Sequence, residues 1–287
     1  MLKPHFLIIG AQKSGTTSLA DALSHHSRVF VCEPMEPEYF SGLVIEKEHG
    51  LAKDEYDSLF QTAPPEALCG EASTGTMLSP EVIPHLEREL PEARLVAVLR
   101  APEKRAYSAY THECKKGRVS VEEQKTIFAD EAECYLRGEK GRFDWFIRSE
   151  YARQLAPFIA HFGTRLKVVI FEELVAEPDK GLQELQEFLG LSPEGLSLTR
   201  ENRSRVPKSR FAEKGIALGR SLVGPLRGLM SERGYRHFRE VLMAKLGKSP
   251  EPLDGDLATR LRSERYGEEI RKLEDQLGRP ILAWETV

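Results

Sequence analysis

The sequence predicts an α/β protein with a central parallel sheet that is covered by helices on both faces. Four short runs of aliphatic and β-branched residues are continuous rather than alternating, which is typical of strands in a doubly covered parallel sheet. Segments with apolar residues at helical spacing lie between these runs. Strands that alternate with helices indicate βαβ units, so we expect this class of fold for the chain of 287 residues.

The expected elements follow one another in a regular order along the chain. The four strands are expected at residues 6–9, 29–32, 94–99 and 166–171. Helices are expected at residues 16–24, 80–90, 103–116, 121–137, 145–162, 179–189 and 258–277. Gly163, Gly190 and Gly278 each follow a helical pattern, at the position where a glycine commonly ends a helix.

Composition argues against several classes of protein. The 41 Lys and Arg against 45 Asp and Glu give a net charge of −4, which disfavours a nucleic-acid binder that works through bulk charge. The apolar run at residues 6–10 is too short for a membrane span or a signal peptide, so we expect a cytoplasmic protein without a transmembrane segment. No CxxC spacing joins the cysteines, and we therefore expect free thiols at Cys32, Cys69, Cys114 and Cys134.

The domain organisation is expected to be simple, although the charge is uneven. No low-complexity linker or internal repeat divides the chain, so we expect one domain over residues 1–287. Residues 203–248 hold 12 Lys and Arg against 3 Asp and Glu, whereas residues 33–94 hold 4 against 14. We expect the basic segment, residues 203–250, to form a lid over an anionic cofactor or the acceptor. Docking of an acidic carrier protein or a membrane surface is the alternative.

The strongest local signal is a glycine-containing loop after the first strand. Residues 7–19 read LIIGAQKSGTTSL, in which Gly10 and Gly15 have the spacing of a Walker A loop. Such a turn directs backbone N–H groups and a helix N-terminus at one point, where phosphate or sulfate binds. Thr16 occupies the position of the Walker lysine, and Lys13 is the only lysine of the loop. The loop therefore predicts an anion site that differs from that of a nucleotide triphosphatase.

A second anion site is predicted at the end of the third expected strand. Residues 95–110 read LVAVLRAPEKRAYSAY, so the strand ends at Arg100, where a Walker B strand would end in Asp. No metal ligand is offered at this point, and we expect that no metal is required. Arg100 and Ser108, two helical turns later, could both bind phosphate at the carboxyl edge of the sheet. A structural ion pair is the alternative role of Arg100.

Together, GAQKSGTTSL and RAPEKRAYSAY resemble the two cofactor signatures of sulfotransferases that use 3′-phosphoadenosine 5′-phosphosulfate (PAPS). The similarity extends in family order to EPEYF, GEAS, IFEELVAEP, FLGL and LxxxLGRPILAW, at residues 36–40, 70–73, 170–178, 188–191 and 273–284. The chain resembles a bacterial-type relative of the heparan-sulfate and polyketide-associated enzymes. The resemblance implies the P-loop-like sulfotransferase fold and release of 3′-phosphoadenosine 5′-phosphate (PAP).

The resemblance also implies which residues bind the cofactor. The 5′-phosphosulfate is expected to contact Lys13, Ser14, Gly15, Thr16 and Thr17. Lys13 is expected to act in catalysis as well, because it would stabilise charge on the leaving phosphate. Arg100 and Ser108 are expected to hold the 3′-phosphate. The basic loop at residues 201–211 adds Arg203 and Lys208 as expected cofactor contacts.

For catalysis, the resemblance implies in-line transfer of a sulfuryl group to a hydroxyl or amine of the acceptor. Glu36 matches the glutamate that acts as general base in heparan-sulfate-type enzymes, and Glu38 could share or replace this role. His112 lies one helical turn beyond Ser108 and is a further candidate facing the acceptor.

The acceptor is not identified by the sequence. Many relatives have lysines where this chain has Met35 and Ala72, which disfavours a heparan-like acceptor. We expect a small molecule, a carbohydrate or a carrier-tethered acceptor, and no oligomeric state is predicted. The alternative functions are a P-loop nucleotide kinase or other phosphotransferase, and a non-catalytic nucleotide-binding module that has lost its base.

Overall fold

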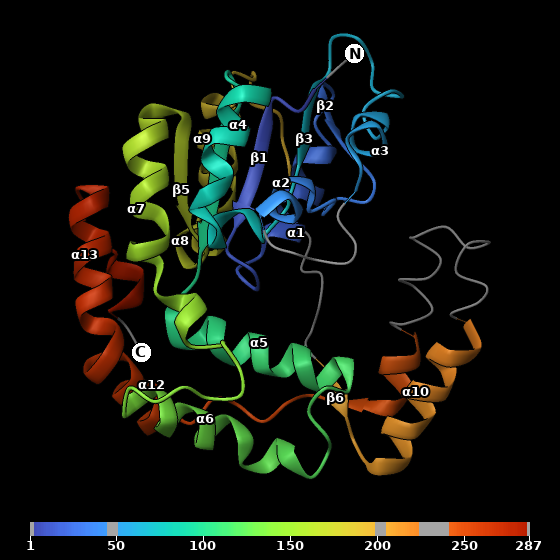
Figure 1. Cartoon of the computed structure of the whole chain (residues 1–287), viewed down its shortest axis with the longest axis vertical. Coiled ribbons are helices and arrows are strands. Elements are labelled where there is room, and N and C mark those ends of the chain that lie inside the picture. The colour runs from blue at the N-terminus through green and yellow to red at the C-terminus, as the bar shows by residue number, and fades with distance from the viewer. Residues whose placement is uncertain (1–2, 45–50, 199–204, 224–240, 286–287) are drawn as a thin grey trace. The chain divides into compact units, whose positions relative to one another are not determined.

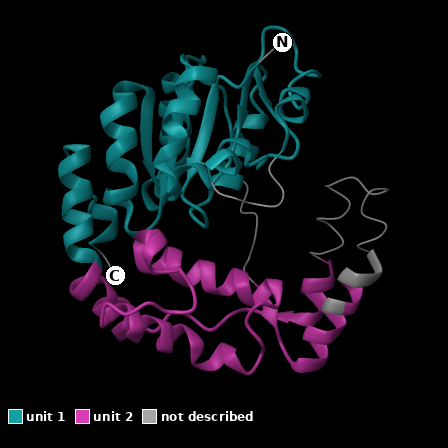
Figure 2. Ribbon diagram, viewed as in Figure 1, with its two compact units in different colours: residues 1–101, 150–201, 266–287 teal, residues 102–149, 202–265 magenta. Residues whose placement is uncertain are grey.

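The computed structural model describes residues 3–44, 51–198, 205–223 and 241–285 (Figure 1). The chain forms two compact units, which Figure 2 colours separately. Unit 1 consists of residues 1–101, 150–201 and 266–287, and unit 2 of residues 102–149 and 202–265. The chain therefore passes between the units four times. The expectation of a single domain stays a prediction, and the two units are described one after the other.

Unit 1 is built on a five-stranded parallel sheet. Its strands are β1 (Phe6–Gly10), β2 (Val29–Val31), β3 (Leu68–Glu71), β4 (Arg94–Leu99) and β5 (Leu166–Ile170). Their spatial order is β2-β3-β1-β4-β5, and each neighbouring pair is parallel. Phe6 of β1 is in register with Gly70 on one side and with Arg94 on the other. The parallel sheet expected from the continuous apolar runs is thus confirmed.

Helices cover both faces of this sheet, as predicted. One face packs against α4 (Ile83–Glu89), α7 (Tyr151–Phe162) and α13 (Gly267–Leu277), and the other packs against α1 (Thr16–Ser24) and α9 (Pro178–Phe188). Alternate residues of β1 supply the two cores: Leu7 and Ile9 enter the first, whereas Phe6 and Ile8 enter the second. Burial of both strand faces explains why β1 is apolar throughout.

Three short helices complete unit 1: α2 (Tyr39–Val44), α3 (Lys53–Ser58) and α8 (Phe171–Ala176). The helix expected at residues 145–162 begins later, because Ile147–Ser149 form a 3₁₀ turn and Glu150 leaves the helical conformation with a ψ of 76°. The helix expected at residues 258–277 is divided by a π-helical turn, Arg262–Tyr266. Positive φ angles at Gly163, Gly190 and Gly278 confirm the predicted helix ends.

Strand β3 was missed because its sequence, LCGE, has only one aliphatic residue. Gly70 is required there by a close approach: a Cβ atom at this position would lie 2.1 Å from Cζ of Phe6 on the neighbouring strand. The ring of Phe6 thus fills the space that a larger side chain on β3 would occupy. Pairing across the sheet, rather than local pattern, makes this segment a strand.

Unit 2 is mainly helical, with α5 (Pro102–Lys116), α6 (Ile127–Leu136), α10 (Arg210–Val223) and α12 (Gly255–Leu261). A short antiparallel ladder joins β6 (Val206–Pro207) to β7 (Gly247–Lys248). Arg105 is fully buried, and its Nε donates to Oγ of Ser149, which in turn donates to the Pro102 carbonyl. The buried Glu103 carboxylate pairs with Arg262 at 2.5 Å. These contacts tie α5 to two later segments of unit 2, at Ser149 and Arg262.

None of the helices in the described residues is long and apolar enough to cross a membrane. All four cysteines are free thiols, and those at 32, 69 and 114 are buried. Helix α10 lies within the segment expected to form a lid. Residues 203–204 and 224–240 of that segment lie outside the described residues, so its role stays a prediction.

The contact between Gly70 and Phe6 predicts the behaviour of a substitution and of its rescue. Gly70→Ala should lower the free energy of unfolding by about 1–3 kcal/mol, because the added methyl group overlaps the ring. Adding Phe6→Leu should recover part of this loss in thermal unfolding, since it opens the space. Gly255→Ala is the control, since a Cβ atom there meets nothing within 4 Å. Equal unfolding midpoints for Gly70→Ala and the wild type would contradict the packing described.

Candidate active site

The loop between β1 and α1 has the backbone geometry of an anion-binding turn. Lys13 and Gly15 have φ angles of 71° and 91°, so the backbone curls sharply before the helix begins at Thr16. A Cβ atom at Gly15 would lie 2.6 Å from the ring of Phe171, so only glycine fits there. Gly15, the N-cap residue of α1, has no side chain with which to cap the helix. The first N–H groups of a helix have no partner within the helix itself, which makes its N-terminus a place where anions bind.

Ser14 is the second sign that this loop takes a ligand. Its side chain is fully buried, and its Oγ has no hydrogen-bond partner within the part of the chain that the structure describes. A buried hydroxyl without a partner is uncommon, because it loses the hydrogen bonds that it made with water. The hydroxyl lies in the loop whose helix N-terminus favours negative charge. These donors fit the oxygens of a phosphate or sulfate group.

Arg100 lies beside this loop, directly after the end of β4. Its guanidinium carbon is 5.4 Å from the ring centroid of Phe171, the same ring that contacts Gly15. Its Nη1 donates to the carbonyl oxygen of Lys13 at 3.5 Å, and the Arg100 carbonyl accepts from the Tyr151 hydroxyl at 2.8 Å. One aromatic ring therefore supports both the loop and the arginine.

Glu172 fixes the strand ends that carry these groups. Its Oε1 accepts from the backbone N–H of Ala101 at 3.1 Å, and its Oε2 accepts from the indole N–H of Trp284 at 2.8 Å. The carboxylate thus joins the end of β4, the start of α8 and the C-terminal region. Phe171, Glu172 and Trp284 lie in the motifs IFEELVAEP and LxxxLGRPILAW, but the sequence alone predicts no role for them. Their motif positions were the available signal.

Glu36 is brought to the same place from the loop after β2. It is exposed, and its Oε1 accepts from the hydroxyl of Thr17 on α1 at 3.5 Å. A carboxylate therefore lies next to the first turn of the anion-binding helix. The structure thus gathers Lys13, Ser14, Arg100 and Glu36 within unit 1, near the carboxyl edge of the sheet.

Glu38 lies two residues further along but has different partners. Its carboxylate accepts from the backbone N–H of Gly75, at 3.1 and 3.2 Å, and from the hydroxyl of Ser41 at 2.5 Å. Its own N–H donates to Oγ of Ser73 at 2.9 Å. The Glu38 side chain is therefore engaged with the segment that follows β3, whereas Glu36 reaches α1.

Glu71, at the end of β3, is a buried carboxyl group close to this region. Burial raises its pKa to about 8, and the charge of Glu38 raises the pKa further, whereas the hydroxyls of Tyr56 and Ser73 oppose the shift. Glu71 is therefore mostly protonated at neutral pH. Glu71 belongs to the GEAS motif, but the sequence alone predicts no role for it.

The other candidates lie in unit 2 or outside the described residues. Ser108 and His112 are half-buried on α5, and the Ser108 carbonyl accepts from the hydroxyl of Thr111 at 3.0 Å. Lys208 is exposed after β6, and its Nζ donates to the Lys245 carbonyl at 3.1 Å. Arg203 lies outside the described residues. The roles expected for these four residues stay predictions.

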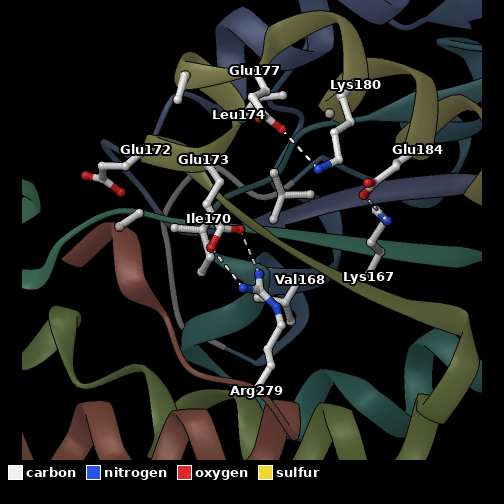
Figure 3. Close-up of a pocket in the computed structure, with 14 residues that line it drawn as sticks. Lys167, Val168, Ile170, Glu172, Glu173, Leu174, Glu177, Lys180, Glu184 and Arg279 are labelled. Carbon is white, nitrogen blue, oxygen red and sulfur yellow. Dashed lines mark hydrogen bonds and ion pairs between the residues drawn. The ribbon is translucent and has the colours of Figure 1, made fainter. Parts of the chain in front are cut away.

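A pocket of about 620 Å³ lies elsewhere in unit 1, between β5, α8, α9 and the C-terminal region (Figure 3). Its charged side chains pair with one another: Arg279 with Glu173, Lys180 with Glu177 and Lys167 with Glu184. Neither the residues of the anion-binding loop nor Glu36 line it. The pocket is therefore distinct from the candidate active site.

Comparison with known proteins agrees with this geometry. The chain matches the sulfotransferase domain family over residues 3–212. It is 27% identical over 298 residues to the bifunctional heparan sulfate N-deacetylase/N-sulfotransferase of Drosophila melanogaster, an alignment that covers 89% of this chain and 28% of the relative. The human bifunctional heparan sulfate N-deacetylase/N-sulfotransferase 2 is also 27% identical, with 98% of this chain and 30% of the relative covered. The chain thus spans less than a third of the length of these relatives.

A solved structure shows the same fold. The sulfotransferase from Alicyclobacillus acidocaldarius matches with a TM-score of 0.68 and 21% sequence identity, over 99% of this chain and 100% of that one. The P-loop-like arrangement expected from the first loop and helix is thereby confirmed.

The raised pKa of Glu71 predicts a pH dependence of stability. Folding raises this pKa from 4.5 to about 8, so the folded protein keeps a proton that the unfolded chain releases between these pH values. The contribution of Glu71 to the free energy of unfolding should therefore fall as the pH rises from about 5 to 8. Glu71→Gln should abolish this decline, and its stability relative to the wild type should improve by about 3–5 kcal/mol between pH 5 and 9.

The measurement is urea unfolding of both proteins across this pH range. Glu81→Gln is the control, because Glu81 is exposed in the same unit. Parallel pH profiles for the wild type and Glu71→Gln would contradict the buried, protonated state of Glu71.

Proposed function

The chain belongs to the sulfotransferase family, and we propose that it transfers a sulfuryl group from PAPS to a hydroxyl or amine of an acceptor. The observation that carries this proposal is the buried Ser14 hydroxyl without a described partner, in a loop that also presents Lys13 and the N-terminus of α1. The neighbouring Glu36 supplies a carboxylate at the same place. An anion site beside an exposed carboxylate is the arrangement that transfer to an acceptor hydroxyl or amine requires.

We assign the 5′-phosphosulfate of the donor to the loop and the first turn of α1, namely to Lys13, Ser14, Gly15, Thr16 and Thr17. The left-handed backbone of the loop and the N-terminus of α1 that follows it support this assignment, because they direct N–H donors at one point. Arg100, whose guanidinium packs against the ring of Phe171, is proposed to bind the 3′-phosphate. Ser108, Arg203 and Lys208 are proposed contacts of the 3′-phosphate on the basis of the family resemblance.

In the proposed mechanism, PAPS supplies an activated sulfuryl group, with PAP as the leaving group and no metal required. The Lys13 ammonium group stabilises negative charge on the leaving phosphate oxygen. The Glu36 carboxylate accepts the proton of the attacking acceptor group. The Thr17 hydroxyl contacts this carboxylate at 3.5 Å, next to the donor loop. Catalysis therefore rests on placement and on charge stabilisation.

The proposed acceptor is less acidic than heparan sulfate. Ala72 is fully buried, and Met35 packs against the apolar core beside it, so neither position presents a cation. A small molecule, a carbohydrate or a carrier-tethered acceptor fits this environment. His112 stays a candidate contact of the acceptor, and a cytoplasmic location stays a prediction. The family match disfavours the nucleotide kinase alternative, whereas the non-catalytic alternative is addressed by substitution of Glu36.

The proposed cofactor site predicts the binding behaviour of PAP. Lys13→Ala and Arg100→Ala should each weaken PAP binding about tenfold or more, because each removes a charge-assisted contact to an anion. Isothermal titration calorimetry measures the affinity. Lys180→Ala is the matched control, since this exposed lysine pairs with Glu177 in the separate pocket of the same unit. If Lys13→Ala and Arg100→Ala both bound PAP with wild-type affinity, the cofactor assignment would be overturned.

The proposed base predicts a loss of transfer without a loss of binding. Glu36→Gln should reduce transfer of ³⁵S-labelled sulfate from PAPS about 10²–10⁴-fold, because an amide cannot accept the proton. Its PAP affinity should stay within about twofold of the wild type, since the change removes no cation or N–H donor from the proposed cofactor site, and Glu36 is anionic like the ligand. The assay uses a panel of a simple phenol, a primary alcohol and an amino sugar. Glu33→Gln, an exposed change in the same loop, is the control. Unchanged transfer by Glu36→Gln would exclude this residue as the base.

A further inference from the structure

The loop that carries Glu36 is attached to the neighbouring segment on both sides of that residue. Before Glu36, the N–H of Cys32 donates to the Gly70 carbonyl at 3.1 Å, and the N–H of Ala72 donates to the Met35 carbonyl at 2.8 Å. These bonds prolong the pairing of β2 with β3 beyond the last residue of β2. They fix the loop up to the residue that precedes Glu36.

After Glu36, Glu38 supplies the described hydrogen bonds that join the loop to the segment after β3. Its backbone N–H donates to Ser73, and its carboxylate accepts from the N–H of Gly75 with both oxygens within 3.2 Å. The Ser41 hydroxyl donates to the same carboxylate from the start of α2. One side chain thus joins the end of the loop, the segment after β3 and the next helix.

The backbone of Glu38 shows that these contacts hold it in an unfavourable conformation. Its φ is 51°, in the left-handed region that costs a residue with a Cβ atom about 1 kcal/mol or more. Such a conformation persists only where the surrounding contacts determine it. The bonds to Ser73, Gly75 and Ser41 provide that determination.

The lack of a side chain at Gly75 leaves room for the Glu38 carboxylate. A Cβ atom at this position would lie 2.4 Å from Oε2 of Glu38 and 3.1 Å from Cβ of Ser41. The carboxylate is therefore in close contact with the backbone, and a side chain at residue 75 would displace it. The protonated state of Glu71 at neutral pH also favours this arrangement, because it removes a like charge near Glu38.

We propose that Glu38 is a positioning residue that holds the loop so that Glu36 faces α1, and that it does not itself serve as a base. This inference rests on the proposed function, because it assigns Glu36 the role of base. The bond from Thr17 to Glu36 is long, at 3.5 Å, so it cannot define the position of Glu36 alone. Residues 35 and 38, on either side, are points at which hydrogen bonds hold the backbone that carries Glu36. Small displacements of a base cost large factors in rate.

A positioning role predicts different kcat values for two variants of Glu38. Glu38→Gln keeps an amide oxygen that can accept from the Gly75 N–H, so its kcat should stay within about threefold of the wild type. Glu38→Ala removes the acceptor and should lower kcat about 10–100-fold, with KM for PAPS and PAP affinity unchanged. If Glu38 were a base, Glu38→Gln would lose as much transfer as Glu36→Gln, and this result would overturn the proposal.

Hydrogen exchange gives a readout that needs no acceptor. Amide exchange at residues 72–75, measured by mass spectrometry with PAP bound, should become faster in Glu38→Ala and in Gly75→Ala, and should be unchanged in Glu33→Ala. If the amide exchange rates at residues 72–75 in Glu38→Ala equalled those of the wild type, the positioning role would be overturned. The thermal unfolding midpoint, together with PAP affinity, shows whether each variant is folded.

The same measurements distinguish the two levels of inference. A wild-type protein that binds PAP but transfers sulfate to no acceptor would overturn the proposed function. In that case, faster exchange in Glu38→Ala would still establish the attachment of the loop. Normal transfer in the wild type together with normal kcat in Glu38→Ala would overturn the positioning role alone.

Discussion

The parallel direction of all five strands is the constraint on which the candidate site depends. Because each strand ends at the same edge of the sheet, the segments that follow them converge there although they are far apart in sequence. The loop after β1 supplies Lys13 and Ser14, the residue after β4 is Arg100, and the residue after β5 is Phe171. The connection after β2 supplies Glu36. Reversal of any one strand would remove its contribution from this edge.

Side-chain packing at this edge of the sheet fixes the positions of the residues that the strand ends bring together. The ring of Phe171 leaves room only for a glycine in the anion-binding loop and supports the guanidinium of Arg100 on the same ring. Glu172 holds the end of β4 through Ala101 and contacts Trp284 with its other oxygen. The cations and donors of the site are thereby supported before any ligand arrives, which reduces the ordering cost of binding.

The sequence predicted those features that depend on local pattern. The apolar run of β1, the loop with Gly10 and Gly15, and Arg100 at the end of a strand are each encoded in a few consecutive residues. Strand β3 was missed because the need for a small residue at Gly70 arises from its contact with the Phe6 ring on β1. The sequence also left open whether Glu36 or Glu38 is the general base, because this depends on which partner each side chain contacts in the folded protein. The burial of Glu71 is likewise a property of the assembled sheet.

The interleaving of the two units has a consequence for how the gene can be altered. Unit 2 enters the chain as two separate stretches, one after the end of β4 and one before α13. No single cut releases either unit, and a polypeptide made of unit 1 alone would require two new joints, from residue 101 to 150 and from residue 201 to 266. Insertions or replacements within the two stretches, in contrast, leave every strand of the parallel sheet in its original order. The sequence of the sheet and that of unit 2 can therefore diverge at different rates while they remain parts of one reading frame.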